Sequence, residues 1–189
     1  MKHDFPSKII FLDTDGVFNI PPYLKFDKRC LENLQTIIDK TGAKIVVSSS
    51  WRDEDSERMK VNYIEHGFTE KLWDEIIDIT CRGYSNVIKG SKLPIVRGNE
   101  IKAWVDTHLK YPWHATPSLG KHYQLLNEDG SFKIMNSNKL GIDYQYVILD
   151  DDTDMLYEQK DNFVNTDGMV GLTSKDVEKA IQILNNIKD

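Results

Sequence analysis

The stretch that decides the fold is Lys8–Asn19, KIIFLDTDGVFN. Its four consecutive apolar residues, Ile9 to Leu12, are typical of a buried strand. Two carboxylates one residue apart, Asp13 and Asp15, follow at once, and then comes Gly16, which lets the chain bend close to a ligand. Residues two apart on an extended chain point the same way, so both carboxylates can face one centre.

The composition is that of an acidic globular protein of ordinary size. With 189 residues, of which 40% are hydrophobic, the chain can bury one core, and a single domain over residues 1–189 is expected. The formal net charge is −6 and the pI is near 5.4, so the broad basic surface of a duplex-binding protein is missing. A long nucleic acid is therefore disfavoured as a partner, whereas a small nucleotide is not.

The sequence carries no targeting pattern and no cysteine motif. The first residues, MKHDFPSK, lack the apolar stretch of a signal peptide. The sequence also has no run of eighteen apolar residues, which a segment that spans a bilayer would need. We therefore expect a cytoplasmic protein without a membrane partner. Cys30 and Cys81 stand far apart without a C-x-x-C pattern, which predicts neither a disulfide framework nor a thiolate zinc site.

Strand-like apolar runs alternate with helical patterns along the chain. Strands are expected at 8–12, 43–47, about 73–80, 144–149 and 162–165, and helices at 28–42, 56–66, 98–109 and 171–187. Asp27 and Gly42 suit the two ends of the first helix, and Thr173 with Asp176 forms a capping box before the last. This alternation predicts an α/β fold with a mostly parallel sheet, in which ligands bind at the carboxyl ends of the strands.

Polar residues follow three of the predicted strands. They are Asp13 and Asp15 after the first, Ser48, Ser49, Ser50, Trp51 and Arg52 after the second, and Asp150, Asp151 and Asp152 after the fourth. Each group alone has a structural explanation as a turn, a helix cap or a set of acids at a helix N-terminus. Their common position at the strand ends of one sheet predicts a functional site.

Carboxylates converging on one sheet edge would repel one another unless a cation lay among them. Hard oxygen ligands at such a site suit Mg²⁺, which is commonly shared with a substrate phosphate. A carboxylate beside Mg²⁺ can attack phosphorus to form an aspartyl-phosphate. A second carboxyl group can protonate the leaving oxygen and then activate water.

The residues also carry a resemblance to a known family. FLDTDGV, IVVSS, a later basic residue and VILDDD are similar to the four ordered motifs of the haloacid dehalogenase (HAD) superfamily, over nearly the whole chain. FLDTDGVFN, AKIVVSSSWR, RGNEIKAW, YVILDDDTDM and TDGMVGLT look like its Swiss Army Knife RNA repair-like group. The resemblance implies a three-layer Rossmann-like parallel sheet with helices on both faces. The segment between Gly16 and Ser48 is too short for a large cap domain.

The resemblance implies roles for the first two motifs. Asp13 matches the nucleophile and a metal ligand, and Asp15 matches the general acid/base, with its backbone carbonyl as a further metal ligand. Ser48 matches the hydroxyl that binds the phosphoryl group, and Ser49 can share this task. Aspartate at position 15 indicates a phosphatase or phosphotransferase, because dehalogenases of this fold lack it and transport ATPases carry threonine there.

The same resemblance implies roles for the last two motifs. Asp150 and Asp151 match the acidic pair, of which at least one binds Mg²⁺. Arg97, at the start of a helix, matches the cation that pairs with the phosphate and the nucleophile, and Lys92 is its rival because lysine is usual in this role.

The substrate is expected to be a phosphorylated small molecule or a nucleotide, including a nucleic-acid end. Trp51 and Arg52, directly after the serines, are expected at the rim of an open site, where the indole can stack on a leaving group and the guanidinium can pair with phosphate. For Trp51, packing over the edge of the sheet is the alternative.

An insertion at about 111–143 departs from the group. HYQLL and SFKIM within it predict a small β-hairpin. Its aromatic residues predict burial, either as a lid over the carboxyl edge of the sheet or as the interface of a homodimer. Packing on the far side of the sheet remains the alternative.

Two other functions stay open for this set of residues. A phosphoryl-accepting signalling module shares the architecture, but receivers of that kind place the acidic pair before the acceptor, whereas here the double acid comes last. A catalytically silent phosphate-binding module could lose the acids, whereas this chain retains all of them.

Overall fold

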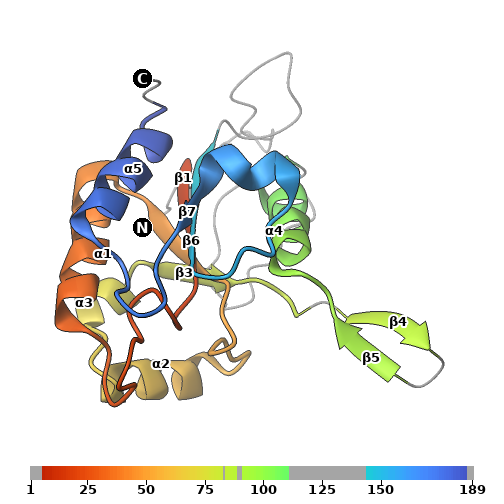
Figure 1. Cartoon of the computed structure of the whole chain (residues 1–189), viewed down its shortest axis with the longest axis horizontal. Helices are drawn as coiled ribbons and strands as arrows, with labels where there is room; N and C mark the ends of the chain where they lie inside the picture. The colour runs from red at the N-terminus through yellow and green to blue at the C-terminus, as the bar shows by residue number, and fades with distance from the viewer. Residues whose placement is uncertain (1–5, 83, 89–90, 111–143, 187–189) are drawn as a thin grey trace, which may run out of the picture.

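A five-stranded parallel sheet forms the centre of the molecule. The computed structural model describes residues 6–82, 84–88, 91–110 and 144–186 (Figure 1). The strands are β1 Lys8–Leu12, β2 Lys44–Val47, β3 Ile76–Ile79, β6 Gln145–Asp150 and β7 Phe163–Asn165, in the order β3-β2-β1-β6-β7. Every neighbouring pair is parallel, which confirms the predicted α/β class. The expected insertion at 111–143, with its hairpin, lies outside the described residues.

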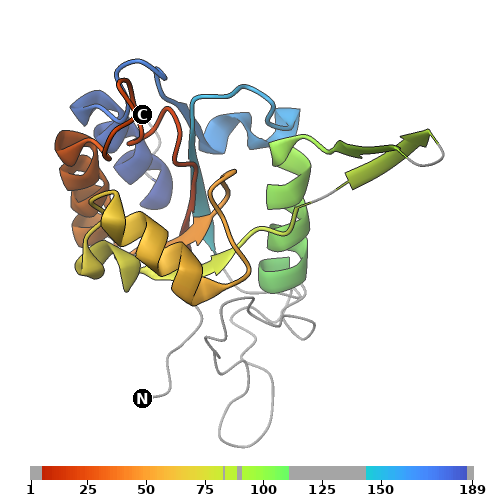
Figure 2. The ribbon, with the colours of Figure 1, turned by 90° about the horizontal axis from the view of Figure 1, so that it is seen from below.

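Helices cover both faces of this sheet (Figures 1 and 2). One face carries α1 Lys28–Thr41, α2 Ser56–Glu65, α3 Glu70–Trp73 and α5 Ser174–Leu184, and the other carries α4 Arg97–Val105, its π-helical extension η1 Asp106–Lys110 and the 3₁₀ helix η3 Tyr157–Asn162. The predicted three layers are thereby confirmed. Among the described residues, none of the helices has the length and apolar character that a membrane crossing requires.

The alternating residues of β1 supply two separate cores. Ile10 and Leu12 pack with α1, α2, α3 and α5, whereas Ile9 and Phe11 pack on the other side with α4. All four side chains are fully buried. A central strand buried on both faces explains why its sequence is a continuous apolar run instead of an alternating one.

The helix ends follow the chemistry expected from the sequence. Asp27 caps α1 by accepting a hydrogen bond from the amide of Cys30 at 2.9 Å, and Gly42 ends it with φ +69°. At the start of α5, Thr173 and Asp176 form the predicted capping box. These caps fix the ends of the two helices that pack side by side on one face of the sheet.

Three short elements were not expected from the sequence. They are α3, η3 and an antiparallel hairpin of β4 Tyr84–Ile88 and β5 Ser91–Pro94, which projects from the body of the molecule (Figures 1 and 2). The single turn of α3 is too short to show a helical period, and its cap, Thr69, gives the main local signal.

The parallel register brings the strand ends together at one edge. The hydrogen-bond ladder continues past the strands, because Asp13 N donates to Leu149 O at 3.0 Å and Ser48 N donates to Leu12 O at 2.8 Å. Thr80 N likewise donates to Val47 O at 3.0 Å. The polar residues after β1, β2, β3 and β6 therefore lie next to one another.

Candidate active site

Three carboxylates meet at the carboxyl edge of the sheet. Asp13, Asp150 and Asp151 each offer an oxygen, and these oxygens lie within 4.8 Å of one another. Asp13 and Asp150 are buried, whereas Asp151 is more open. The loops after β1 and β6 thus bring together three of the acids expected at a metal site.

The cluster is electrostatically unfavourable without a cation. Burial and the nearby charge of Asp13 raise the pKa of Asp150 to about 8. Burial also raises the pKa of Asp13, although the guanidinium of Arg97 opposes this shift, and burial raises the pKa of Asp151. A divalent cation among the three groups would stabilise their ionised forms.

Two glycines make room for the Asp151 carboxylate. A Cβ on Gly16 would lie 2.0 Å from Asp151 Cγ, and a Cβ on Gly168 would lie 2.5 Å from Asp151 Oδ2. Gly16 also has φ +66°, a conformation that L side chains rarely adopt. Gly16 is therefore needed both for the turn and for the close approach of Asp151 from the loop after β6.

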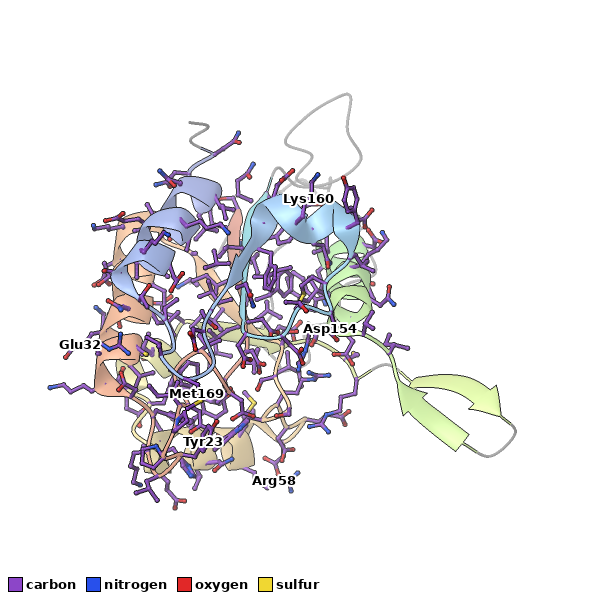
Figure 3. All side chains as sticks on the ribbon, in the orientation of Figure 1. Tyr23, Glu32, Arg58, Asp154, Lys160 and Met169 are labelled. Atoms are coloured by element: carbon purple, nitrogen blue, oxygen red, sulfur yellow. The ribbon has the colours of Figure 1, made fainter. Side chains whose placement is uncertain are left out.

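Arg97 lies beside the acids at the first turn of α4. Its Nε is 3.9 Å from Asp150 Oδ2, and its Nη1 donates to the carbonyl oxygen of Ser48. Asp154, which Figure 3 labels close to the start of α4, accepts a hydrogen bond from Arg97 N at 2.8 Å and fixes this turn. The structure thus brings Arg97 into the cluster, whereas the side chain of Lys92 lies outside the described residues.

The two serines after β2 have different surroundings. The hydroxyl of Ser49 is hydrogen-bonded to Asp13, where it favours the ionised carboxylate and lowers the Asp13 pKa against the effect of burial. The hydroxyl of Ser48 accepts from Thr80 Oγ1 at 3.3 Å. Both serines are buried, so Ser49 is the hydroxyl that lies against the expected nucleophile.

Asp15 is held by donors from two loops. Its Oδ1 accepts from Asn19 Nδ2 at 2.6 Å and from Trp51 Nε1 at 2.9 Å, and its Oδ2 accepts from Ser50 Oγ at 3.2 Å. The carboxylate oxygens of Asp15 thus have hydrogen-bond partners of their own. Its expected contribution to a metal site is its backbone carbonyl.

The expected placement of Arg52 at an exposed rim is wrong. Its guanidinium is only 5% exposed and pairs with Glu100, which is 6% exposed, at 2.6 Å between Nη2 and Oε2. Nη1 also donates to Ser49 O at 2.8 Å. The partner acid on α4 draws Arg52 into the interior, where it supports the serine loop, residues 48–51.

The ring of Trp51 packs against three other aromatic side chains. Its centroid lies 5.3 Å from that of Phe26, 6.2 Å from that of Tyr63 and 5.1 Å from that of His66. These contacts explain why the indole, expected as a stacking surface, is partly buried instead.

Sequence reasoning missed two residues at this edge. Arg82 is exposed and donates through Nη2 to Ser50 O at 2.7 Å. It follows β3, so its signal is the same as for the other groups, namely its place after the end of a strand. Asn19 has a local signal, since it lies four residues after Asp15 in the same turn.

An exposed apolar rim lies on the loops that follow β1 and β7. It comprises Tyr23, Leu24, Met169 and Val170, each at least 42% exposed. The two loops that carry these side chains are adjacent, because Leu172 N donates to Val17 O at 2.8 Å and Thr166 Oγ1 donates to Gly16 O at 2.8 Å. Figure 3 labels Tyr23 and Met169 on these loops.

Comparison with family models matches residues 9–123 to the HAD domain in Swiss Army Knife RNA repair proteins. The chain belongs to this family. A HAD domain indicates a function of the phosphohydrolase type. Asp150 and Asp151 lie beyond the matched residues, and it is the fold that brings them to the Asp13 of the HAD domain. Comparison with curated proteins and with solved structures finds no significant match.

Proposed function

We propose that this protein is a Mg²⁺-dependent phosphomonoester hydrolase that works through an aspartyl-phosphate on Asp13. The observation that carries the proposal is the meeting of Asp13, Asp150 and Asp151 within 4.8 Å, with Arg97 beside them. A buried carboxylate flanked by further acids and one guanidinium suits attack on a phosphoryl group.

The donor set fits a hard divalent cation. All three groups are carboxylates, which Mg²⁺ prefers as ligands, and Gly16 and Gly168 leave room for the third of them. Asp13, Asp150 and Asp151 would hold the ion, together with the backbone carbonyl of Asp15. Bound Mg²⁺ neutralises the acids and polarises the phosphoryl oxygens.

The residues of the chain would perform two displacements. A carboxylate oxygen of Asp13 attacks phosphorus and forms an acyl-phosphate bond, while the bond from phosphorus to the leaving oxygen breaks and Asp15 gives its proton to that oxygen. Water then attacks phosphorus, Asp15 takes back a proton, and the bond to Asp13 breaks to release inorganic phosphate. Asp13 and Asp15 are thereby returned to their starting states.

Positioning of the phosphoryl group falls to Ser49 and Arg97. The Ser49 hydroxyl lies beside Asp13, and we propose that it turns its one proton from the Asp13 carboxylate to a phosphoryl oxygen when substrate binds. Arg97 adds a fixed positive charge near Asp13 and Asp150, which favours an anionic substrate.

For the substrate, we favour a nucleotide or a nucleic-acid end. The family description names RNA repair proteins, the apolar rim offers a surface for a planar leaving group, and exposed Arg82 offers a cation for a further phosphate. The net charge of −6 counts against a long polymer.

The decisive test is hydrolysis of an aryl phosphate by the purified protein. We expect turnover with Mg²⁺, no turnover in excess chelator, and none with Asp13→Asn. Asp152→Asn is the matched control, since Asp152 belongs to the same acidic run but not to the cluster, and this variant should keep most of its turnover.

Two outcomes would overturn this function. Turnover by Asp13→Asn or in chelator would exclude the proposed mechanism. A single stoichiometric release of product without turnover would instead favour the phosphoryl-accepting module.

A further inference from the structure

The two oxygens of Asp15 have unequal partners. Oδ1 accepts two N–H groups, those of Asn19 and Trp51, at 2.6 and 2.9 Å. Neither the amide nor the indole can accept a proton in return, because each is a donor at that nitrogen. The partner of Oδ2 is the hydroxyl of Ser50 at 3.2 Å, which can both donate and accept.

We propose that Trp51 is a positioning residue, whose indole N–H fixes Oδ1 of Asp15 so that Oδ2 is the oxygen that exchanges a proton with the leaving group. This inference rests on the proposed hydrolase function and assigns within it a role to a residue outside the acid cluster.

The ring of Trp51 is well held for this purpose. Phe26, Tyr63 and His66 surround it, with centroids 5.1 to 6.2 Å away. Tyr63 is fully buried, so the aromatic side chains around Trp51 are continuous with the core. A ring held in this way loses little further conformational entropy when its N–H forms a hydrogen bond. A lysine or glutamine at the same place would lose more, because its side chain has more rotatable bonds.

Trp51 also reaches the nucleophile through its main chain. Its backbone N–H donates to Ser49 Oγ at 3.2 Å, and that hydroxyl is bonded to Asp13. One residue therefore orients the proton donor through its side chain and the neighbour of the nucleophile through its backbone. Replacing the side chain alone separates these two roles.

The effect of replacing Trp51 on the reaction rate should therefore depend on the leaving group of the substrate. A basic alkoxide must be protonated as it departs, whereas a nitrophenolate leaves readily without a proton. A misplaced Asp15 should therefore slow phosphoryl transfer to Asp13 from an alkyl phosphate much more than that from p-nitrophenyl phosphate. The later attack of water uses Asp15 with either substrate, so the two substrates are compared by kcat/KM, which does not include that step. A general loss of structure would slow both alike.

The kinetic test uses Trp51→Phe, which keeps a ring in the aromatic cluster and removes the N–H. We expect kcat/KM for an alkyl phosphate to fall at least about 10-fold, within the contribution of a placed general acid, and kcat/KM for p-nitrophenyl phosphate to fall less than about 3-fold. In an Asp15→Ala background the same substitution should have no further effect on either substrate.

Trp73→Phe is the matched control. Trp73 also packs against Tyr63, with centroids 6.0 Å apart, but it lies on α3. We expect this variant to keep the leaving-group dependence of the original protein. Equal losses on both substrates with Trp51→Phe, or a further loss in the Asp15→Ala background, would overturn the inference while leaving the hydrolase function intact.

A second measurement is independent of activity. The four indole N–H groups give separate ¹H–¹⁵N resonances, and that of Trp51 is assigned by its loss in Trp51→Phe. In Asp15→Ala the Trp51 resonance should shift while that of Trp73 stays in place. An unmoved Trp51 resonance would refute the contact, even if the protein hydrolysed no phosphate at all.

Discussion

Replacing Gly16 by alanine should weaken Mg²⁺ binding more than it weakens the fold. A Cβ at this position would lie 2.0 Å from Asp151 Cγ, whereas ordinary contact begins at 3.4 Å. The carboxyl group must therefore retreat by about 1.4 Å, the difference between these distances. Because Mg²⁺ requires near-ideal ligand geometry, Asp151 would be lost as a ligand. Loss of an outer-shell partner alone costs about 10- to 100-fold in metal affinity, so we expect a loss of at least about 10-fold.

Gly42→Ala separates this effect from backbone strain. Gly42 has φ +69°, close to the +66° of Gly16, but a Cβ there would meet nothing within 4 Å. Both variants should lose roughly 1–2 kcal/mol of unfolding free energy from the left-handed conformation, measured by urea titration in chelator. Only Gly16→Ala should lose Mg²⁺ affinity in calorimetric titration. Equal affinities in the two variants and the original protein would refute the assignment of Asp151 as a ligand.

Three further predictions follow from burial and charge. The pKa of Asp150 is raised from 3.8 to about 8, so in chelator the free energy of unfolding should fall as pH rises through this window, by up to about 1.4 kcal/mol per unit from this group. Mg²⁺ should therefore raise the melting temperature more at pH 8 than at pH 5, and an equal rise at both would contradict this. Arg52→Met should cost about 3–5 kcal/mol in urea unfolding because it removes the buried cation that pairs with the Glu100 carboxylate, and the double replacement Arg52→Met with Glu100→Met should cost less. Iodoacetamide should label exposed Cys81 and spare Cys30, which is buried and has its pKa raised to about 11; mass spectrometry showing equal labelling of the native protein would contradict the structure.

The features predictable from the sequence are those with a local cause. The apolar run before Asp13 is typical of a buried strand, and Asp27 and Gly42 mark the ends of α1 by their own capping chemistry. The meeting of Asp13 and Asp150 followed from a topological rule, since the carboxyl ends of parallel strands share one edge. None of these inferences required knowledge of a distant side chain.

The errors concern residues whose environment is set by distant partners. Arg52 follows three serines and was expected to be exposed, but an acid 48 positions later draws it inward. For Trp51 the sequence left open stacking on a substrate or packing over the edge of the sheet, and Phe26 and His66 from other segments pack against its ring. Pairings of this kind depend on the packing of α4 and α2 against the loop, which no local pattern of the chain encodes.

The same packing explains why the second and third motifs belong together. Arg97 and Glu100 lie three residues apart, so they share one face of the first turn of α4. Arg97 donates to Ser48 O, and Glu100 accepts from Arg52 at the other end of the serine loop. α4 therefore contacts the serine loop through two side chains, and Arg97 also lies beside Asp150. A shift of α4 would move the serine loop, and with it Trp51 and its hydrogen bond to Asp15. The helix that supplies the cation thus also sets the position of the proton donor.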